Sequence, residues 1–391
     1  MATTKGSAPW PMVKLGDICT ITIGKTPARK NESYWGEGFP WLSIKDMNQG
    51  RYLSETSEKI TQAAVNETNP RLCESGTVVF SFKLSIGKVG ITTVPMYTNE
   101  AIAAFVPKER ADLDRNFLYH ALRWTGRNAG GADAVMGKTL NKKTLSGLEI
   151  PLPPLDEQRR IAEILDRSEK NVSRSQTLSR LYSDLASEMV RGFEDRAKHL
   201  VFLHELGEFR GGMTPSKAVK KYWNGGINWF TTKDLSGKMN LSESLVRISS
   251  WAIEETSLKQ LSSRAIAFSL RGMSLVHRVP MGIIPEGSAI NQDLKAFIPH
   301  RDDLTEVLYW QIKLKEPLLL SKVSSSAHGT RKLDFEHLQS FKIPAIQDHD
   351  LEDLLTRLRN IADLVSIDLR RLEVAQELHK SLSTRAFQGE L

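Results

Sequence analysis

The chain has 391 residues, with 53 Lys or Arg against 46 Asp or Glu and a formal net charge of +7. This length is enough for two hydrophobic cores of ordinary size. The 2 cysteines exclude a disulfide framework and predict a reducing, cytoplasmic location. Neither a signal peptide nor an apolar run of about 18 residues is present, so we expect no membrane association.

The two halves of the chain resemble each other. Residues 34–46 read YWGEGFPWLSIKD, and residues 222–234 read YWNGGINWFTTKD, 188 positions later. The same offset relates VVFS at 78–81 to IAFS at 266–269, and an Ile-Pro pair follows in each half. Collinear matches separated by small gaps in one direction argue against chance similarity. Because the period is about half the chain, the pattern indicates a duplicated domain rather than a solenoid.

Each repeat is predicted to be an α+β domain. In the first, residues 78–82 and 90–94 are β-branched and aromatic runs on either side of a Ser-Ile-Gly-Lys turn, which is typical of two strands. A buried strand is expected from residue 101 to Pro107. Short helices are expected at 115–124 and, in the second repeat, at 304–314.

A long helix is predicted after each Ile-Pro. From Leu155 to about Phe193 there is no proline and one glycine, and Asp156-Glu157 favours a helix start. Apolar and small residues recur at a 4-3-4-3 spacing, which is the seam of a coiled coil. The seams run through Ile161, Leu165, Ser168, Val172, Ser175, Ser179, Tyr182, Ala186 and Met189, and through Leu354, Leu358, Ile361, Val365, Asp368, Leu372, Ala375, His379 and Leu382. Two helices lying on their own domains are the alternative, but the narrow seams favour helices that pair with each other.

The predicted organisation alternates domain and helix. The first globular domain spans 1–150, the central helix lies in 151–199, the second globular domain spans 200–342, and the last helix lies in 343–391. Each globular segment holds 19 Lys and Arg against 14 Asp and Glu, whereas the rest of the chain holds 15 against 18. Equal basic charge on two similar domains favours a polyanionic partner such as nucleic acid.

No catalytic motif is recognisable. Residues 131–139, GADAVMGKT, resemble a phosphate-binding loop but have five residues between the glycines rather than four. Histidines are scattered and the carboxylates form no recognisable pair. We therefore expect no catalytic residue and no metal site.

The predicted nucleic-acid contacts lie in polar loops of both repeats. Lys and Arg bind phosphates, Arg also reads guanine, and small polar residues let the backbone approach. For any single lysine, a solvated turn residue is an equally good interpretation. The candidates are Lys45, Lys83, Ser85, Lys88, Lys138, Thr139, Asn141 and Lys142 in the first domain, and Lys233, Arg271, Ser274, Arg278, Thr330, Arg331 and Lys332 in the second.

One junction carries a family resemblance. Residues 150–162, IPLPPLDEQRRIA, strongly resemble the junction between a target-recognition domain and a conserved helix in type I restriction-modification specificity subunits. The segment RAFQGEL at 385–391 resembles the usual C-terminus of that family, and the resemblance extends over essentially the whole chain. The second junction, at 343–350, departs from the pattern because it lacks the Pro-Pro-Leu-x-Glu-Gln core. Partner docking at that helix is therefore expected to differ.

The resemblance implies a fold and a function. It implies two target-recognition domains joined by two long helices that form an antiparallel coiled coil. Each domain would read half of a bipartite site in double-stranded DNA, and the helices would set the unread spacer. The implied partners are two methyltransferase subunits that use S-adenosylmethionine and motor-nuclease (restriction) subunits that use ATP and Mg.

In this interpretation the chain selects the site without reacting on it and holds no cofactor of its own. Two other function classes stay open. One is a standalone nuclease or methyltransferase that acts through carboxylates not paired in the sequence, and the other is a scaffold whose duplicated domains bind protein.

Overall fold

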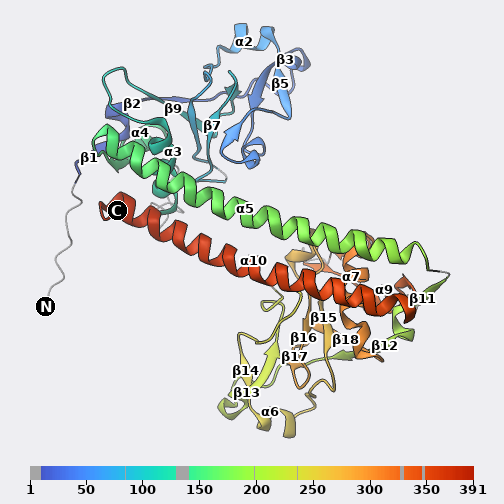
Figure 1. Ribbon diagram of the computed structural model, residues 1–391. Helices are drawn as coiled ribbons and strands as arrows, with labels where there is room; N and C mark the ends of the chain where they lie inside the picture. Colours follow the sequence, from blue (N-terminus) through green and yellow to red (C-terminus); the bar gives the residue numbers. More distant parts are fainter. Residues whose placement is uncertain are drawn as a thin grey trace, which may run out of the picture. The chain divides into compact units, whose positions relative to one another are not determined.

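The computed structural model divides into two compact units (Figure 1). Unit 1 comprises Met1–Ser173 and Glu373–Leu391, and unit 2 comprises Arg174–Leu372. Each long helix contributes to both units, so the domain boundaries drawn from the sequence stay a prediction. The residues that the structure describes are 10–83, 85–128, 141–197, 199–235, 237–325, 330–345 and 348–391.

The described residues of unit 1 form three β-sheets and four short helices. Its five-stranded sheet has the order β2-β9-β6-β7-β4, and a three-stranded sheet has the order β5-β3-β8. The third sheet pairs β1 with β10 and joins the start of the domain to the residues just before the long helix. The strands are β1 (Met12–Lys14), β2 (Cys19–Ile23), β3 (Trp35–Leu42), β4 (Tyr52–Leu53), β5 (Glu58–Ile60), β6 (Val78–Ser81), β7 (Val89–Thr92), β8 (Tyr97–Thr98), β9 (Ile102–Pro107) and β10 (Glu149–Pro151). The helices are α1 (Leu15–Ile18), α2 (Gln62–Thr68), α3 (Arg115–Asn128) and α4 (Lys142–Ser146), with 3-10 turns at Glu32–Tyr34 and Asp46–Gln49.

Unit 2 repeats this plan. A four-stranded sheet has the order β12-β18-β15-β16, a three-stranded sheet has the order β14-β13-β17, and β11 pairs with β21. The strands are β11 (Leu200–Phe202), β12 (Gly207–Gly211), β13 (Trp223–Phe230), β14 (Arg247–Ile248), β15 (Ala265–Ser269), β16 (Met281–Ile284), β17 (Ala289–Ile290), β18 (Leu294–Pro299), β19 (Ser324–Ser325), β20 (Arg331–Lys332) and β21 (Lys342–Pro344). The helices are α6 (Ser250–Glu254), α7 (Thr305–Leu314), α8 (Glu316–Leu320) and α9 (Phe335–Gln339), with 3-10 turns at Leu203–Glu205, Lys220–Tyr222, Met273–Val276 and Asp302–Leu304.

The repeated Tyr-Trp segment builds the same structure in both units. It forms the bulged strands β3 and β13, each of which pairs antiparallel on one side and parallel on the other. Trp41 and Trp229 each donate an indole N–H, at 3.1 Å, to a main-chain carbonyl 16 residues earlier. A second tryptophan packs edge-on against each, with ring centroids 5.0 and 5.3 Å apart. The sequence repeat is therefore a repeat of architecture, as predicted.

The aliphatic strands form the cores. Val78, Phe80 and Phe105 of unit 1 are buried against the apolar face of α3, and Ile266, Phe268 and Phe297 occupy the corresponding positions under α7. The predicted strands are present within one or two residues of their expected bounds. Pro107 is the last paired residue of β9 and lies opposite Cys19 of β2. The predicted α+β class is confirmed.

The two long helices are α5 (Leu155–Glu194) and α10 (Asp348–Gln388). In unit 1 the start of α5 packs against the end of α10, where Ile161 and Leu165 share a core with Phe387. In unit 2 the end of α5 packs against the start of α10, where Val190 shares a core with Leu358. The helices therefore pair antiparallel, and the heptad prediction is confirmed. No helix in the described ranges is long and apolar enough to cross a membrane.

Candidate nucleic-acid interface

In unit 1, two of the predicted basic segments lie together. The Lys88 ammonium group, in the loop between β6 and β7, donates to the carbonyl of Ile44 at 3.2 Å and to Oδ1 of Asn48 at 2.7 Å. These contacts hold the β6–β7 loop against the turn that follows β3. Lys45, on that turn, is exposed. Lys88 therefore has a structural role in addition to any role in binding.

The β6–β7 loop is shaped by Ser81. Its hydroxyl donates to the carbonyl of Ser85 at 2.5 Å and accepts the N–H of Lys88 at 3.0 Å. Gly87 occupies a positive φ of 97°, which favours glycine. This arrangement leaves the side chains of Lys83 and Ser85 exposed.

Asn141 and Lys142 lie at the start of α4. Asn141 caps that helix, because its side chain accepts the N–H of Thr144 at 3.0 Å while the Thr144 hydroxyl accepts the N–H of Asn141 at 2.8 Å. Helix α4 packs against α1 and β2, and β2 lies on the far side of β9 from β6. The structure therefore places these two residues apart from the β6–β7 loop. Lys138, Thr139 and the loop at 131–139 lie outside the described residues.

In unit 2 the predicted basic residues of two loops come together. Arg271 pairs with Lys332 in an isolated antiparallel bridge, and the N–H of Gly272 donates to the carbonyl of Arg331 at 3.0 Å. Thr330 is exposed beside them. The Arg331 guanidinium also contacts the hydroxyl of Ser325. A segment about 60 residues away in sequence is thus brought next to the β15–β16 loop.

The turn after β13 joins the same region. The hydroxyls of Thr232 and Ser269 are 2.9 Å apart, which brings the segment carrying Lys233 to the end of β15. Arg278 donates to the carbonyl of Leu235 at 3.4 Å, so it holds this turn much as Lys88 holds its counterpart in unit 1. Ser274 lies in the 3-10 turn between these contacts, and its carbonyl accepts from Arg278 N at 2.9 Å.

A carboxylate, half-buried in unit 1 and buried in unit 2, supports the turn in both units. Asp46 accepts from the N–H and hydroxyl of Ser43 at 2.9 and 2.6 Å, and from the N–H of Ser57 at 3.0 Å. Asp234 accepts the same set from Thr231, and from an N–H 11 residues later. Burial raises the pKa of Asp46, but the hydrogen bonds from Ser43 and Ser57 outweigh burial and hold the pKa below its usual value. The Lys-Asp dipeptide at 45–46 and 233–234 is therefore in part a turn motif, because its aspartate holds the turn.

The cations differ in what they already bind. Lys88, Arg278 and Arg331 make the contacts described above. Lys332 forms an ion pair with Asp334. The remaining cations are exposed and, within the part of the chain that the structure describes, form no ion pair. They are Lys45, Lys83, Lys142, Lys233 and Arg271. These side chains are free to bind phosphate.

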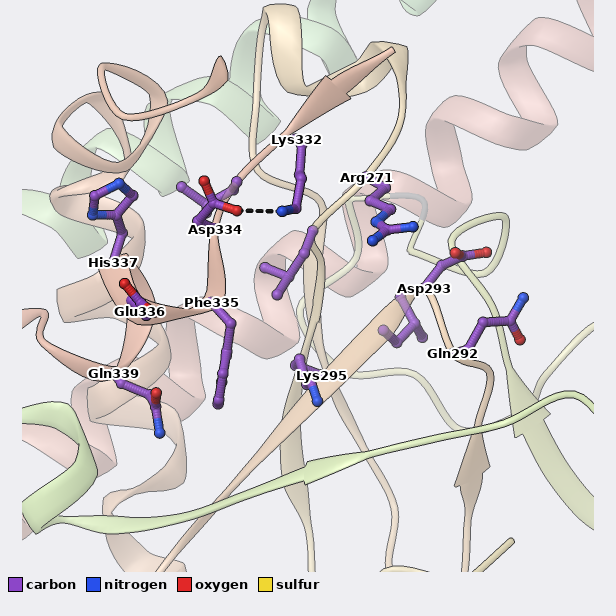
Figure 2. A pocket seen from close by; sticks show the side chains of 13 residues that line it. Arg271, Gln292, Asp293, Lys295, Lys332, Asp334, Phe335, Glu336, His337 and Gln339 are labelled. Atoms are coloured by element: carbon purple, nitrogen blue, oxygen red, sulfur yellow. Dashed lines mark ion pairs between the residues drawn. The ribbon is translucent and has the colours of Figure 1, made fainter. Parts of the chain in front are cut away.

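An open groove of about 820 Å³ lies beside the joined loops of unit 2 (Figure 2). Figure 2 shows Arg271, Lys332 and Lys295 at the groove, together with the amide of Gln292. The Lys295 ammonium lies 4.9 Å from the ring centroid of Phe335. Asp293, Asp334 and Glu336 also line the groove, so its charge is mixed.

Sequence reasoning missed Lys295 and Gln292. Lys295 is the second residue of the apolar strand β18, and Gln292 lies two residues before that strand. A cation in such a strand is the signal that marks a groove-facing position. Their location beside Arg271 depends on the pairing of β15 with β18, which the sequence does not specify.

One group of possible metal ligands occurs among the described residues, formed by His120, Asp166 and Glu169. Arg51 forms ion pairs with both carboxylates, and Arg123 pairs with Glu169. Because two guanidinium groups already neutralise the two carboxylates, this group is an ion-pair network rather than a metal site.

The structure has a duplicated α+β domain, basic loops on each copy and two long helices that pair antiparallel. Together these features define a modular two-domain recognition protein. The family model described as type I restriction modification DNA specificity domain matches residues 8–180 and 198–346. The chain therefore belongs to this family.

The MjaIX specificity subunit of a type I restriction enzyme from Methanocaldococcus jannaschii is 28% identical over 189 residues, which cover 47% of this chain and 43% of that protein. The EcoR124I/EcoR124II specificity subunit from Escherichia coli is 28% identical over 183 residues, covering 46% and 45%. Each match thus spans less than half of the relative.

Two solved structures share the fold over nearly the whole chain. The S subunit of the type I restriction-modification system from M. genitalium has a TM-score of 0.56 at 12% identity, covering 99% of this chain and 98% of that one. A structure that addresses complex assembly of the type I R-M system has a TM-score of 0.50 at 19% identity, covering 99% and 100%. These likenesses show the fold, including its paired domains and helices.

Proposed function

We propose that this chain is the sequence-specific DNA-binding specificity subunit of a type I restriction-modification complex. Each unit would contact one half of a bipartite site in double-stranded DNA. One observation carries the proposal. In both repeats a basic β-hairpin loop is held against a basic turn by the same type of contact. Lys88 in unit 1 and Arg278 in unit 2 each donate to a main-chain carbonyl of that turn. Two such surfaces on one chain suit a target with two separate parts.

The exposed cations would supply most of the affinity. Lys45 and Lys83 in unit 1, and Lys233 and Arg271 in unit 2, would bind phosphates, while the guanidinium of Arg271 also has the geometry for a guanine edge. Ser85, Ser274 and Thr330 would be polar contacts at the edges of these surfaces, whereas Asn141 and Lys142 would contact DNA separately, at the start of α4. Gln292 and Lys295 extend the surface of unit 2 along the groove.

The chain would not catalyse a reaction itself. Methyltransferase subunits would bring S-adenosylmethionine, and restriction subunits would bring ATP and Mg. We place the docking of the partner subunits on the long helices, where several leucines are exposed. In unit 2 these are Leu181 and Leu185 of α5 and Leu364 of α10, which are 51%, 49% and 44% exposed. We place this assembly in the cytoplasm.

A map of N6-methyladenine in the source genome, with and without this gene, tests the proposal. Loss of one bipartite motif on deletion is the expected result. An unchanged map in a strain where the partner methyltransferase is expressed would contradict it.

A reconstituted complex tests the residues. The double variant Lys233→Ala/Arg271→Ala should lower the slope of log affinity against log salt by about 2, since each phosphate contact contributes about 1. Lys259→Ala is the matched control, because Lys259 is exposed in the loop before β15 rather than after it. Equal slopes for the double variant and the control would refute the assignment of this surface.

A further inference from the structure

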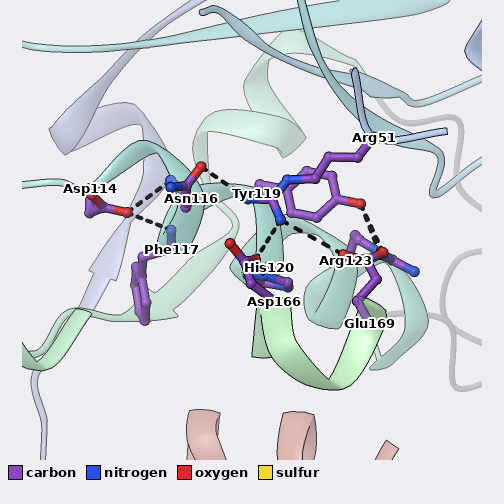
Figure 3. Close-up of polar contacts among 9 residues, drawn as sticks. All are labelled: Arg51, Asp114, Asn116, Phe117, Tyr119, His120, Arg123, Asp166 and Glu169. Carbon is purple, nitrogen blue, oxygen red and sulfur yellow. Dashed lines mark hydrogen bonds and ion pairs between the residues drawn. The ribbon is translucent and has the colours of Figure 1, made fainter. Parts of the chain in front are cut away.

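A network of ion-paired and hydrogen-bonded side chains fastens α5 to the globular part of unit 1 (Figure 3). The Nε2 atom of His120 is 2.6 Å from Oδ1 of Asp166, and Arg51 pairs with the same carboxylate. Arg123 pairs with Glu169 and donates to the hydroxyl of Tyr119 at 2.8 Å. The side chains of His120 and Arg51 are only 2% and 12% exposed. We name Arg51, His120, Arg123, Asp166 and Glu169 the clamp.

The clamp joins three elements. Arg51 immediately precedes β4, His120 and Arg123 lie on α3, and Asp166 and Glu169 lie on α5. Asn116 and Tyr119 orient Arg51 further. The Arg51 guanidinium donates a hydrogen bond to Oδ1 of Asn116 at 2.9 Å, and its Cζ atom lies 4.5 Å from the ring centroid of Tyr119. The contacts of His120 and Arg51 with Asp166 and that of Arg123 with Glu169 reach α5, and together they define its alignment on the domain.

Arg51 also lies close in sequence to the candidate DNA surface. The carbonyl of Arg51 accepts the N–H of Ile91 at 2.7 Å, and the turn just before it carries Asn48, which binds Lys88. Arg51 therefore connects this turn and the β6–β7 loop to α5.

Unit 2 uses different residues at the corresponding contact. The carbonyl of Met239 accepts the N–H of Ile283 at 2.6 Å, so Met239 occupies the position of Arg51. The matching Leu-Tyr pairs at 118–119 and 308–309 place Trp310 at the position of His120, and Met239 and Trp310 lie in one apolar cluster. The ion pairs of unit 2 at this contact are Lys315–Glu194 and Arg359–Glu306. The clamp of unit 1 is therefore not repeated residue for residue in unit 2.

We propose that the clamp is a positioning device, which holds the first recognition domain in one orientation on α5 and thereby restricts the spacer length that the complex accepts. The inference rests on the proposed function. Buried ion pairs contribute little net stability compared with apolar residues of similar size, but they are satisfied in only one geometry. Apolar side chains tolerate small rotations, because their contacts have no direction.

The test replaces four residues of the clamp by apolar residues. The variant Arg51→Met/His120→Ile/Asp166→Ala/Glu169→Ala is assembled with the methyltransferase subunits and given S-adenosylmethionine. The substrates are duplexes that carry both half-sites, with the spacer shortened or lengthened by one or two base pairs. A second set keeps the natural spacer and changes single bases of one half-site.

We expect methylation of the altered spacers, relative to the natural spacer, to rise roughly tenfold, the factor set by one charge-assisted hydrogen bond. Half-site preference should stay unchanged. A purely structural role would lower activity on every substrate in proportion and leave the ratio between spacers unchanged, which would overturn the proposal.

Two controls separate the possible failures. The single variant Arg51→Met removes fewer contacts and should relax the spacer in the same direction even if the fourfold variant does not fold. His120→Gln retains a donor for Asp166 and should keep the natural spacer ratio. If the wild-type complex methylates no bipartite duplex, the proposed function fails before the clamp is tested.

Discussion

Replacement of Phe387 by alanine should destabilise unit 1 strongly. Phe387, near the end of α10, is 3% exposed. Its ring centroid lies 5.5 Å from that of Phe117 and 5.2 Å from that of Trp124, both on α3. Truncation of a buried phenylalanine costs about 3–5 kcal/mol, and that range includes the lost aromatic contacts. Because a domain has a net stability of only about 5–15 kcal/mol, this loss removes a large part of it.

Hydrogen exchange followed by mass spectrometry would measure the change in each unit of the intact chain. The expected result is faster exchange in residues 115–126, by a factor that corresponds to about 3–5 kcal/mol, with unchanged exchange in β15 and β18 of unit 2. Phe387→Leu keeps most of the apolar volume and should cost about 1.5 kcal/mol or less. Leu364→Ala, on the same helix but 44% exposed, is the matched control. A change below about 1 kcal/mol for Phe387→Ala would refute the role assigned to this contact.

Two further predictions concern stability. A Cβ on Gly24 would lie 2.2 Å from the carbonyl oxygen of Asn99, so Gly24→Ala should lower the melting temperature. A Cβ on Gly192 would meet no atom within 4 Å, so Gly192→Ala should stabilise α5 by about 1 kcal/mol. A shift of the melting temperature in the same direction for both variants, measured by scanning calorimetry, would contradict this. The lowered pKa of Asp46 means that its carboxylate stabilises unit 1 above the unfolded pKa of about 3.9, and that this stabilisation disappears as the pH falls through the folded pKa. Urea titrations at pH 7 and pH 3 should therefore show a smaller pH effect for Asp46→Asn than for wild type, and an equal effect would show that Asp46 is not the group responsible.

Local patterns in the sequence predicted the architecture well. The heptads predicted two long helices that pair, because the spacing of apolar residues depends only on helix geometry, while the antiparallel direction was implied by the family resemblance. The tryptophan repeat gave the duplicated domain, because the indole N–H of Trp41 bonds to a carbonyl in the same local motif. Both predictions rest on residues that lie near one another in the chain.

The parts that the sequence did not reveal depend on long-range contacts. Lys88 was predicted as a DNA contact, but its ammonium group is held by a carbonyl 44 residues away. His120 and Asp166 are 46 positions apart, so the histidines appeared scattered and the carboxylates unpaired. Gln158, in the family junction, is fully buried and accepts the N–H of Asp114 at 2.8 Å, a contact with a residue 44 positions away.

The division of α10 between the units has a consequence for synthesis on the ribosome. Unit 1 takes residues 1–173 from the early part of the chain and residues 373–391 from 200 positions later, while unit 2 is continuous in between. The core of unit 1 lacks Ala386 and Phe387 until unit 2 has been translated. The second domain can therefore fold first, and a premature stop near the end of the message would damage the domain encoded at its beginning.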